Sequence, residues 1–124
     1  MGLTAAGFEW EVLGRVVHVL EGNLLLVDLD LGWQVYHRSR VKVLGLEIHD
    51  APRLAHEARR RAQQLLPQGT PVIVHSIRMN RLSRSCDAYV SYGPGFEPRS
   101  DEGSFVLAMI ASGCGIQSPD LAAR

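Results

Sequence analysis

The sequence has little that would mark a secreted or membrane-bound protein. Its 124 residues include two cysteines, Cys86 and Cys114, whose spacing fits no metal-binding pattern. We therefore expect two reduced, mostly buried thiols rather than a disulfide. No apolar run reaches the roughly 18 residues of a membrane span. The first residues lack the basic head and apolar run of a secretory signal, so we expect a cytoplasmic protein with no membrane partner.

A surplus of one charge is also absent. Lysine plus arginine and aspartate plus glutamate number 13 each, so the formal net charge is zero. This balance argues against a general nucleic-acid or membrane binder, whose affinity rests on excess positive charge, and leaves room only for a local basic patch. The apolar fraction of 46% is typical of a folded protein. A chain of this length suits one domain that buries its own core.

Hydrophobic periodicity predicts three strands in the first part of the chain, after a short lead-in over residues 1–7. Residues 24–31 alternate with period two, which places Leu25, Val27, Leu29 and Leu31 on one buried face. Glu21-Gly22-Asn23 predicts a tight turn, because glycine and asparagine tolerate positive φ. The three predicted strands span residues 8–20, with a kink at Gly14, residues 24–31 and residues 33–46.

The second part of the chain predicts two helices and two strands. Residues 51–66 carry apolar side chains at helical spacing, with Pro52 in the first turn and Arg59–Arg61 largely on the solvent side. The remaining elements are a strand over 70–77, a basic loop over 78–85, a strand over 86–92, an exposed loop over 93–103, a helix over 104–112 capped by Ser104, and a tail over 116–124. This β-β-β-α-β-β-α order predicts a mainly β, α+β domain over residues 8–115: a five-stranded OB-type barrel with a capping helix and a short C-terminal helix.

Candidate metal ligands gather where the predicted strands end. The third strand runs into Glu47, His49 and Asp50, and a curled sheet brings Glu21 and Asn23 of the turn near them. Oxygen ligands of this kind suit a hard divalent cation. Two other interpretations stay open: Glu21-Gly22-Asn23 is a plain hairpin turn, and His49 and His56, beside Asp50 and Glu57, are either transition-metal ligands or ordinary surface histidines.

Candidate phosphate contacts are arginines in the strands and the basic loop. OB barrels bind single strands through basic grooves and aromatic side chains. The arginines are Arg38, Arg40, Arg78, Arg81 and Arg84. Tyr36, Tyr89 and Tyr92 are either stacking residues for bases or residues at the rim of the core.

The order of these segments resembles the staphylococcal nuclease (thermonuclease) family over residues 12–115. Glu21-Gly22-Asn23-Leu24 stands where that family has Asp-Gly-Asp-Thr, and residues 41–50 stand where it has Val-Arg-Leu-x-Gly-Ile-Asp-x-Pro-Glu. Glu57-Ala58 matches a Glu-Ala pair in the helix. The basic residues 81–84, followed by Ala88-Tyr89-Val90, match a basic loop before the fifth strand, and Gly113-Cys114-Gly115 matches a terminal Gly-x-Ala.

The resemblance implies an endonuclease chemistry that uses Ca²⁺, two phosphate-binding arginines and a glutamate near the attacking water. Carried over by position, the metal acids fall on Asn23 and Glu47, the arginines on Lys42 and Arg84, and the glutamate on Asp50. Glu21 is a further candidate Ca²⁺ ligand, with which a different set of metal ligands could form. In an alternative register, Asp50 is the metal acid and Arg53 replaces the glutamate. Only Arg84 keeps the residue of the family.

These substitutions predict weakened catalysis. Asn23 removes a negative charge from the ion site, and Lys42 loses the two-pronged grip of arginine on a phosphate. The first hypothesis is a domain directed at single-stranded DNA or RNA, with Lys42, Asp50 and Arg84 in the former catalytic positions, Arg40, Arg78, Arg81 and Tyr89 on the nucleic acid, and hydrolysis weakened or lost. The second is an active Ca²⁺-dependent nuclease, a hydrolase with a rearranged ligand set of Glu21, Asn23 and Glu47. The third is a protein-interaction module that uses the fold alone.

Overall fold

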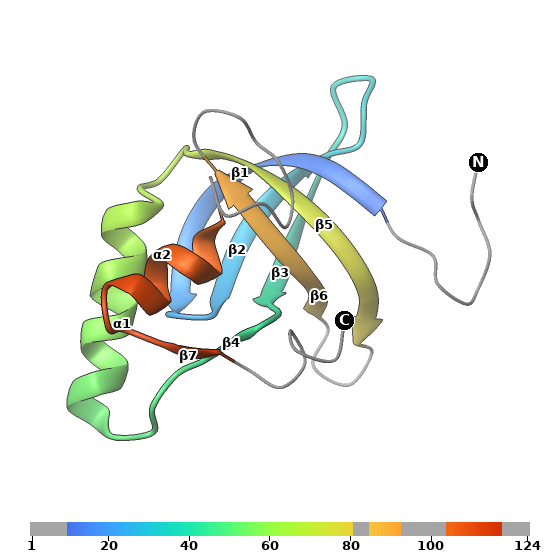
Figure 1. Ribbon diagram of the computed structural model, residues 1–124. Helices are drawn as coiled ribbons and strands as arrows, with labels where there is room; N and C mark the ends of the chain where they lie inside the picture. The colour runs from blue at the N-terminus through green and yellow to red at the C-terminus, as the bar shows by residue number, and fades with distance from the viewer. Residues whose placement is uncertain (1–9, 81–84, 93–103, 118–124) are drawn as a thin grey trace.

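Five strands close into a barrel in the computed structural model, which describes residues 10–80, 85–92 and 104–117. The strands follow each other around the barrel in the order β1-β2-β3-β6-β5 (Figure 1). Their bounds are β1 Trp10–Glu21, β2 Leu24–Asp30, β3 Tyr36–Val43, β5 Pro71–Asn80 and β6 Ser85–Tyr92. Two helices, α1 Pro52–Leu65 and α2 Phe105–Ala111, accompany the barrel. The predicted fold, a mainly β OB-type barrel with two helices, is confirmed.

Neighbouring strands pair antiparallel except at one seam. β3 runs parallel to β6, from Arg40 beside Ser85 to Val43 beside Ala88. The long β1 pairs with β2 along one part and with β5 along another, and Gly14 takes part in both ladders. A Cβ atom at Gly14, where a kink was predicted, would lie 2.6 Å from Cγ1 of Val27, so the core leaves no room for a side chain there. The register irregularities of β1 lie farther along, between Val16 and His18 and between Val19 and Glu21.

The core follows the period-two pattern of the strands. Leu25 and Val27 of β2 are 0% exposed, as the alternation predicts. Leu31, assigned to the same buried face, is 48% exposed, and this part of the prediction is wrong. The reason is that β2 ends at Asp30 and the turn that follows projects beyond the barrel (Figure 1).

Several predicted boundaries differ from the structure. β3 begins at Tyr36, because Leu31–Val35 form the turn. Gly45, with φ of 85°, ends that strand and separates it from the short β4, Leu46–Glu47. β5 continues to Asn80, into the segment predicted as a loop. Ile116–Gln117, predicted to begin the tail, form β7, which pairs with β4.

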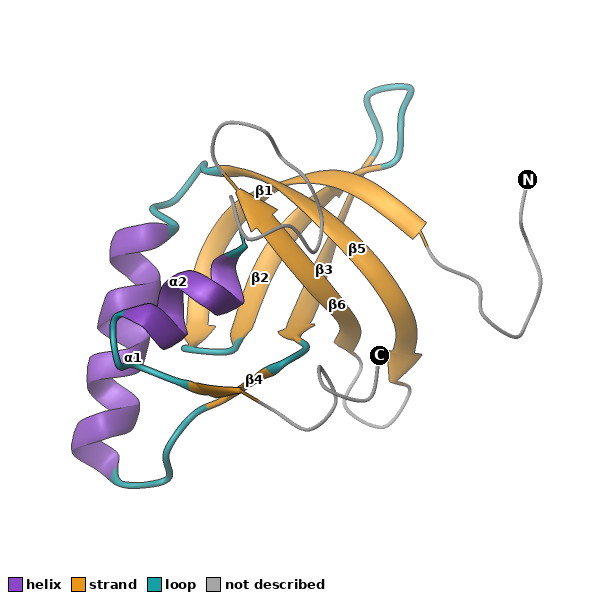
Figure 2. Cartoon of the chain, in the orientation of Figure 1, coloured by secondary structure: helices purple, strands orange, loops and turns teal. Residues whose placement is uncertain are grey.

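Both helices lie on one side of the barrel (Figure 2), and α1 packs on β1 while α2 packs on β6. Pro52 starts α1, and Ser104 caps α2 by accepting a hydrogen bond from the Leu107 amide at 3.3 Å, as predicted. Cys86 is buried and Cys114 is half-buried, and both are free thiols. None of the helices in the described part of the chain is long and apolar enough to cross a membrane.

The β2–β3 hairpin is closed by a turn and braced by an ion pair. The Val35 amide donates to the Gly32 carbonyl at 2.9 Å, and the two residues between them, Trp33 and Gln34, have φ of 57° and 61°. This is the geometry of a type I′ turn, which matches the twist of paired strands. Below it, Nε and Nη2 of Arg38 donate to the two carboxylate oxygens of Asp28 at 2.8 and 3.1 Å.

Leu25 is buried and Leu31 is exposed in this hairpin, so alanine substitutions at the two positions compare the effect of core burial on the free energy of unfolding. We expect Leu25→Ala to lower the free energy of unfolding by about 2–5 kcal/mol, because it leaves a cavity in the core. Leu31→Ala removes the same atoms from an exposed position and should change stability by less than about 0.5 kcal/mol. Urea midpoints at constant m-value would measure both. Equal losses in the two variants would contradict the assignment of the core.

The Asp28–Arg38 pair gives a second prediction. The hydrogen bonds from Arg38, supported by charge attraction, lower the pKa of Asp28 below its ordinary value. The ionised carboxylate therefore stabilises the fold above that ordinary pKa, and the contribution disappears as pH falls through the lowered pKa of the folded state. We expect Arg38→Gln to raise the pKa of Asp28, measured by NMR titration of its carboxyl carbon. An unchanged titration curve would show that the ion pair does not form in solution.

Candidate functional site

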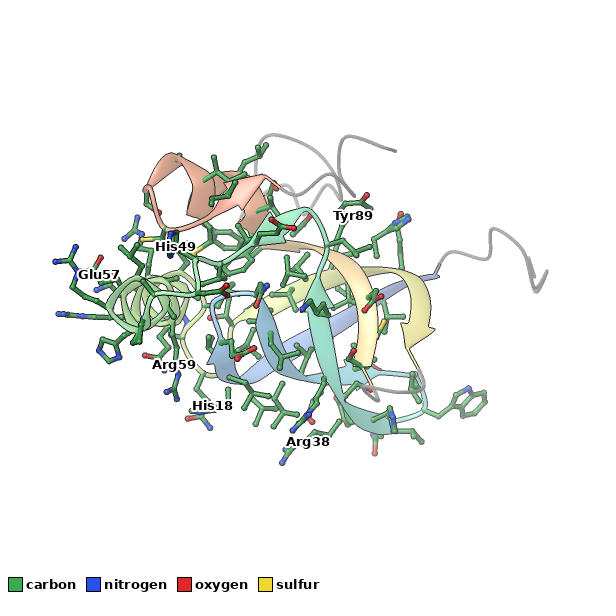
Figure 3. All side chains as sticks on the ribbon, turned by 90° about the horizontal axis from the view of Figure 1, so that it is seen from below. His18, Arg38, His49, Glu57, Arg59 and Tyr89 are labelled. Atoms are coloured by element: carbon green, nitrogen blue, oxygen red, sulfur yellow. The ribbon has the colours of Figure 1, made fainter. Side chains whose placement is uncertain are left out.

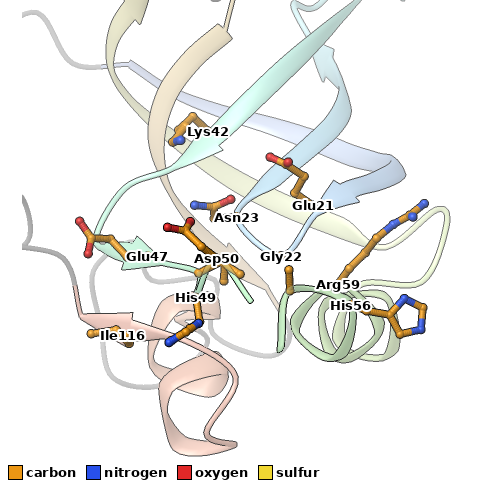
Figure 4. A pocket seen from close by; sticks show the side chains of 12 residues that line it. Glu21, Gly22, Asn23, Lys42, Glu47, His49, Asp50, His56, Arg59 and Ile116 are labelled. Atoms are coloured by element: carbon orange, nitrogen blue, oxygen red, sulfur yellow. The ribbon is translucent and has the colours of Figure 1, made fainter. Parts of the chain in front are cut away.

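A groove of about 780 Å³ lies at the end of the barrel where β1 meets β2 and where β3 ends. It receives side chains from the β1–β2 turn, from Lys42 of β3, from the segment after β3, from one face of α1 and from Ile116 of β7 (Figure 4). The lining residues are Glu21, Gly22, Asn23, Lys42, Glu47, Ile48, His49, Asp50, Ala55, His56, Arg59 and Ile116. The metal and catalytic positions that the sequence placed between residues 21 and 50 thus share one cavity.

Gly22 allows this cavity to form. A Cβ atom at Gly22 would lie 3.0 Å from both Cβ of Ala58 and Cδ1 of Ile48. Neither Gly22 nor Asn23 has a positive φ, so the predicted reason for the Glu21-Gly22-Asn23 turn is wrong. The turn needs glycine because α1 lies directly over it, and this close approach sets the depth of the groove.

Asn23 ties the two sides of the groove together. Its backbone carbonyl accepts from the Val43 amide at 2.9 Å, and its side-chain Nδ2 donates to the Leu46 carbonyl at 3.3 Å. The Oδ1 atom of the same amide keeps its acceptor capacity. Asn23 therefore has a structural role that an aspartate, which lacks the donor, cannot fill.

The carboxylates line the groove without converging on one point. Figure 4 shows Asp50 beside Asn23, with Glu21 on the far side and the Glu47 carboxylate pointing outward. Glu47 points outward because it alternates with the buried Leu46 in β4. Among the residues the structure describes, no group of three or more histidine, cysteine, aspartate or glutamate side chains is arranged to hold a metal ion. The predicted oxygen cluster is therefore looser than a ready-made cation cage.

The histidines do not add a metal centre to this arrangement. Nδ1 of His49 accepts from the Ala51 amide at 3.1 Å, which fixes the ring just before α1. His56 is exposed at the helix side of the groove. Glu57 instead lines a neighbouring pocket of about 170 Å³, which also includes His49 and Cys114. The transition-metal interpretation has no supporting cluster within the described ranges.

Sequence reasoning missed Arg59 as a groove residue. Arg59 lines the groove and its Nε donates to the Val19 carbonyl at 3.4 Å, whereas the triplet Arg59–Arg61 was assigned to a solvated face. Arg60 is exposed outside the groove, as that assignment predicts, whereas Arg61 is half-buried and its Nη1 donates to Oε1 of Gln64 at 3.2 Å. The helical spacing could have predicted this position. Arg59 lies four residues after Ala55 and therefore on the same face of the helix, at the edge of the apolar stripe.

The predicted nucleic-acid contacts have different outcomes. Arg40 is exposed on β3. Tyr89 is 5% exposed, a position that favours the core-rim alternative over base stacking. Tyr92 packs edge-on against Phe105 at a centroid distance of 6.5 Å, as expected of a core-rim residue. Arg81, Arg84 and the side chain of Arg78 lie outside the described residues.

The two possible sequence alignments near Asp50 match the family's glutamate to different residues, either Asp50 or Arg53. Asp50 lines the groove, whereas Arg53 is an exposed residue of the first turn of α1 and is not part of the lining. Asp50 therefore lies in the groove whichever alignment holds. In the alignment that matches Asp50 to the glutamate, the metal positions Asn23 and Glu47 also line the groove.

Comparison with known proteins gives no independent assignment for this chain. No family model matches its sequence, and no curated protein matches it.

Proposed function

We propose that the chain is a staphylococcal-nuclease-like domain directed at single-stranded nucleic acid, in which metal-dependent phosphodiester hydrolysis is weakened or lost. One observation carries the proposal. Glu21, Asn23, Lys42, Glu47 and Asp50 come from three separate segments, and all five line the same groove. This is the arrangement expected if these positions correspond to the metal and phosphate sites of the family that the sequence resembles.

The composition of the groove supports weakened catalysis. Hydrolysis needs an ion held by several oxygens at near-fixed distances, and errors of about half an ångström matter. Here the outward direction of Glu47 and the bond from Asn23 to Leu46 leave Asp50 and Glu21 as the nearest charged candidates. Lys42 supplies a single point charge where arginine would bind two phosphate oxygens.

Arg59 partly restores what Lys42 lacks. Its Nε is engaged by the Val19 carbonyl, while the fork of its terminal nitrogens is suited to two phosphate oxygens. It lines the groove from α1, at the opposite edge from Lys42, with the Glu21 carboxylate between the two in the view of Figure 4. We therefore assign phosphate binding in the groove to Lys42 and Arg59. The resemblance assigns a further phosphate contact to Arg84, which lies outside the described residues.

Binding and cleavage of short single-stranded DNA and RNA test the proposal. We expect the wild type to bind with an affinity that falls as salt is added. Lys42→Ala, Arg59→Ala and Arg84→Ala should each weaken binding and lower the salt slope by about one. Arg60→Ala removes an exposed arginine from the same helix outside the groove and is the matched control. No binding at low salt would refute the proposal.

The same samples distinguish the active-nuclease alternative. We expect little or no cleavage with Ca²⁺ or Mn²⁺. Metal-dependent cleavage that disappears in Asp50→Ala or Glu47→Ala would instead show an active nuclease with a rearranged ligand set. Single-turnover assays at excess enzyme would measure slow hydrolysis without the limit of product release.

A further inference from the structure

A row of exposed basic and aromatic side chains leads away from the groove along β3. Side chains two residues apart on a strand share one face. On β3 the outward positions are Tyr36, Arg38, Arg40 and Lys42, and all four are exposed, while Val41 and Val43 point into the core. The row runs from Tyr36 to Lys42, which is six residue steps or about 20 Å of strand, and it begins at the groove with Lys42.

The neighbouring strands add positive charge to this face. Arg15 of β1 pairs in register with Asp28 of β2, and Asp28 pairs with Arg38 of β3, so one acid lies between two arginines. In the next row, His18 of β1 and Arg40 of β3 flank the apolar Leu26. Figure 3 shows His18 and Arg38 on the same side of the barrel, opposite Tyr89. Asp30 pairs with Tyr36, and Glu21 pairs with Leu24, in the same ladders. The face therefore carries four cations, Arg15, Arg38, Arg40 and Lys42, against the three acids Glu21, Asp28 and Asp30.

The hairpin tip extends the row with an exposed tryptophan. Trp33 is 97% exposed, and Tyr36 is 58% exposed. Trp33 and Gln34 both adopt the left-handed conformation that glycine or asparagine would take without strain. A large aromatic residue held in this way, without packing against the barrel, suggests selection for contact with something outside.

We propose that the outer face of β1–β3, from Lys42 through Arg40 to Tyr36 and Trp33, is the path of a single-stranded polynucleotide. The inference rests on the proposed function and adds a path and a stacking platform at the far end. Charge complementarity favours this occupant, because cations spaced along a strand follow a phosphate backbone and aromatic rings at the end stack on bases. A purely apolar partner would leave the Arg40 and Lys42 charges without a role.

Tryptophan fluorescence and equilibrium binding test the path. In a Trp10→Phe background, Trp33 is the remaining tryptophan, and its emission should be quenched when a single strand of about 10 nucleotides binds. Trp33→Ala should weaken binding by about 5- to 150-fold, and Trp33→Phe should restore most of it. Arg40→Ala should weaken binding to all sequences and lower the salt slope by about one. Parallel DNA and RNA arms identify the preferred strand.

Leu31→Ala is the control that separates stacking from apolar docking. Leu31 is exposed in the same tip but cannot stack on a base, so its removal should leave nucleotide binding unchanged. If Trp33→Ala binds as the wild type does while Lys42→Ala weakens binding, the path is wrong and the groove proposal stands. If no form binds, both fail. A third outcome is that the wild type dimerises or binds vesicles, and that both Trp33→Ala and Leu31→Ala lose this association without a change in nucleotide affinity. This result would identify the hairpin tip as a contact site for protein or lipid and would overturn the path.

Discussion

The parallel pairing of β3 with β6 is the constraint on which the site depends. It closes the barrel, and the closure continues past the strand end, where the Leu44 amide donates to the Ala88 carbonyl at 2.8 Å. Parallel neighbours need a long crossover, and here β4, α1 and β5 supply it. The crossover brings α1 back over the β1–β2 turn. The groove is therefore a consequence of barrel closure, because it lies between this turn and the first part of the connection, from Glu47 to Arg59.

The fit between α1 and the turn shows how small residues determine a functional cavity. Ala58 and Ala62 are buried against the barrel, and Gly22 lies under Ala58 without room for a side chain. A larger residue at any of these positions would lift the helix. Lifting it would move Arg59 away from Lys42 and widen the groove. Packing and charge geometry are thus coupled through one helix–turn contact.

Strand periodicity and helix signals were sufficient to predict the barrel, because the alternating residues of β2 and the Pro52 and Ser104 boundaries are local features. The site was only partly predictable. Glu21, Lys42 and Asp50 could be placed near one another from strand order, but the outward direction of Glu47 depends on the pairing of β4 with β7, a contact between distant segments. Gly32 indicates a turn after β2, but the positive φ of Trp33 and Gln34 was not predictable, because neither residue is a glycine or an asparagine. Arg59 was missed because three consecutive arginines suggest a solvated surface unless each is placed on the helix separately.

Binding and hydrolysis place different electrostatic demands on this barrel. Without an ion, the groove has three carboxylates, Glu21, Glu47 and Asp50, against the two cations Lys42 and Arg59, so the acids weaken the attraction of these cations for a phosphate. Charge interactions in physiological salt are screened beyond about 8 Å. Since the strand rises about 3.3 Å per residue, Arg40 lies about 7 Å from Lys42 and Arg38 about 13 Å from it. The proposed path therefore begins near the three groove carboxylates and extends beyond their screened range toward Tyr36. Loss of the ion would then remove hydrolysis and leave binding to the face of β3 largely intact.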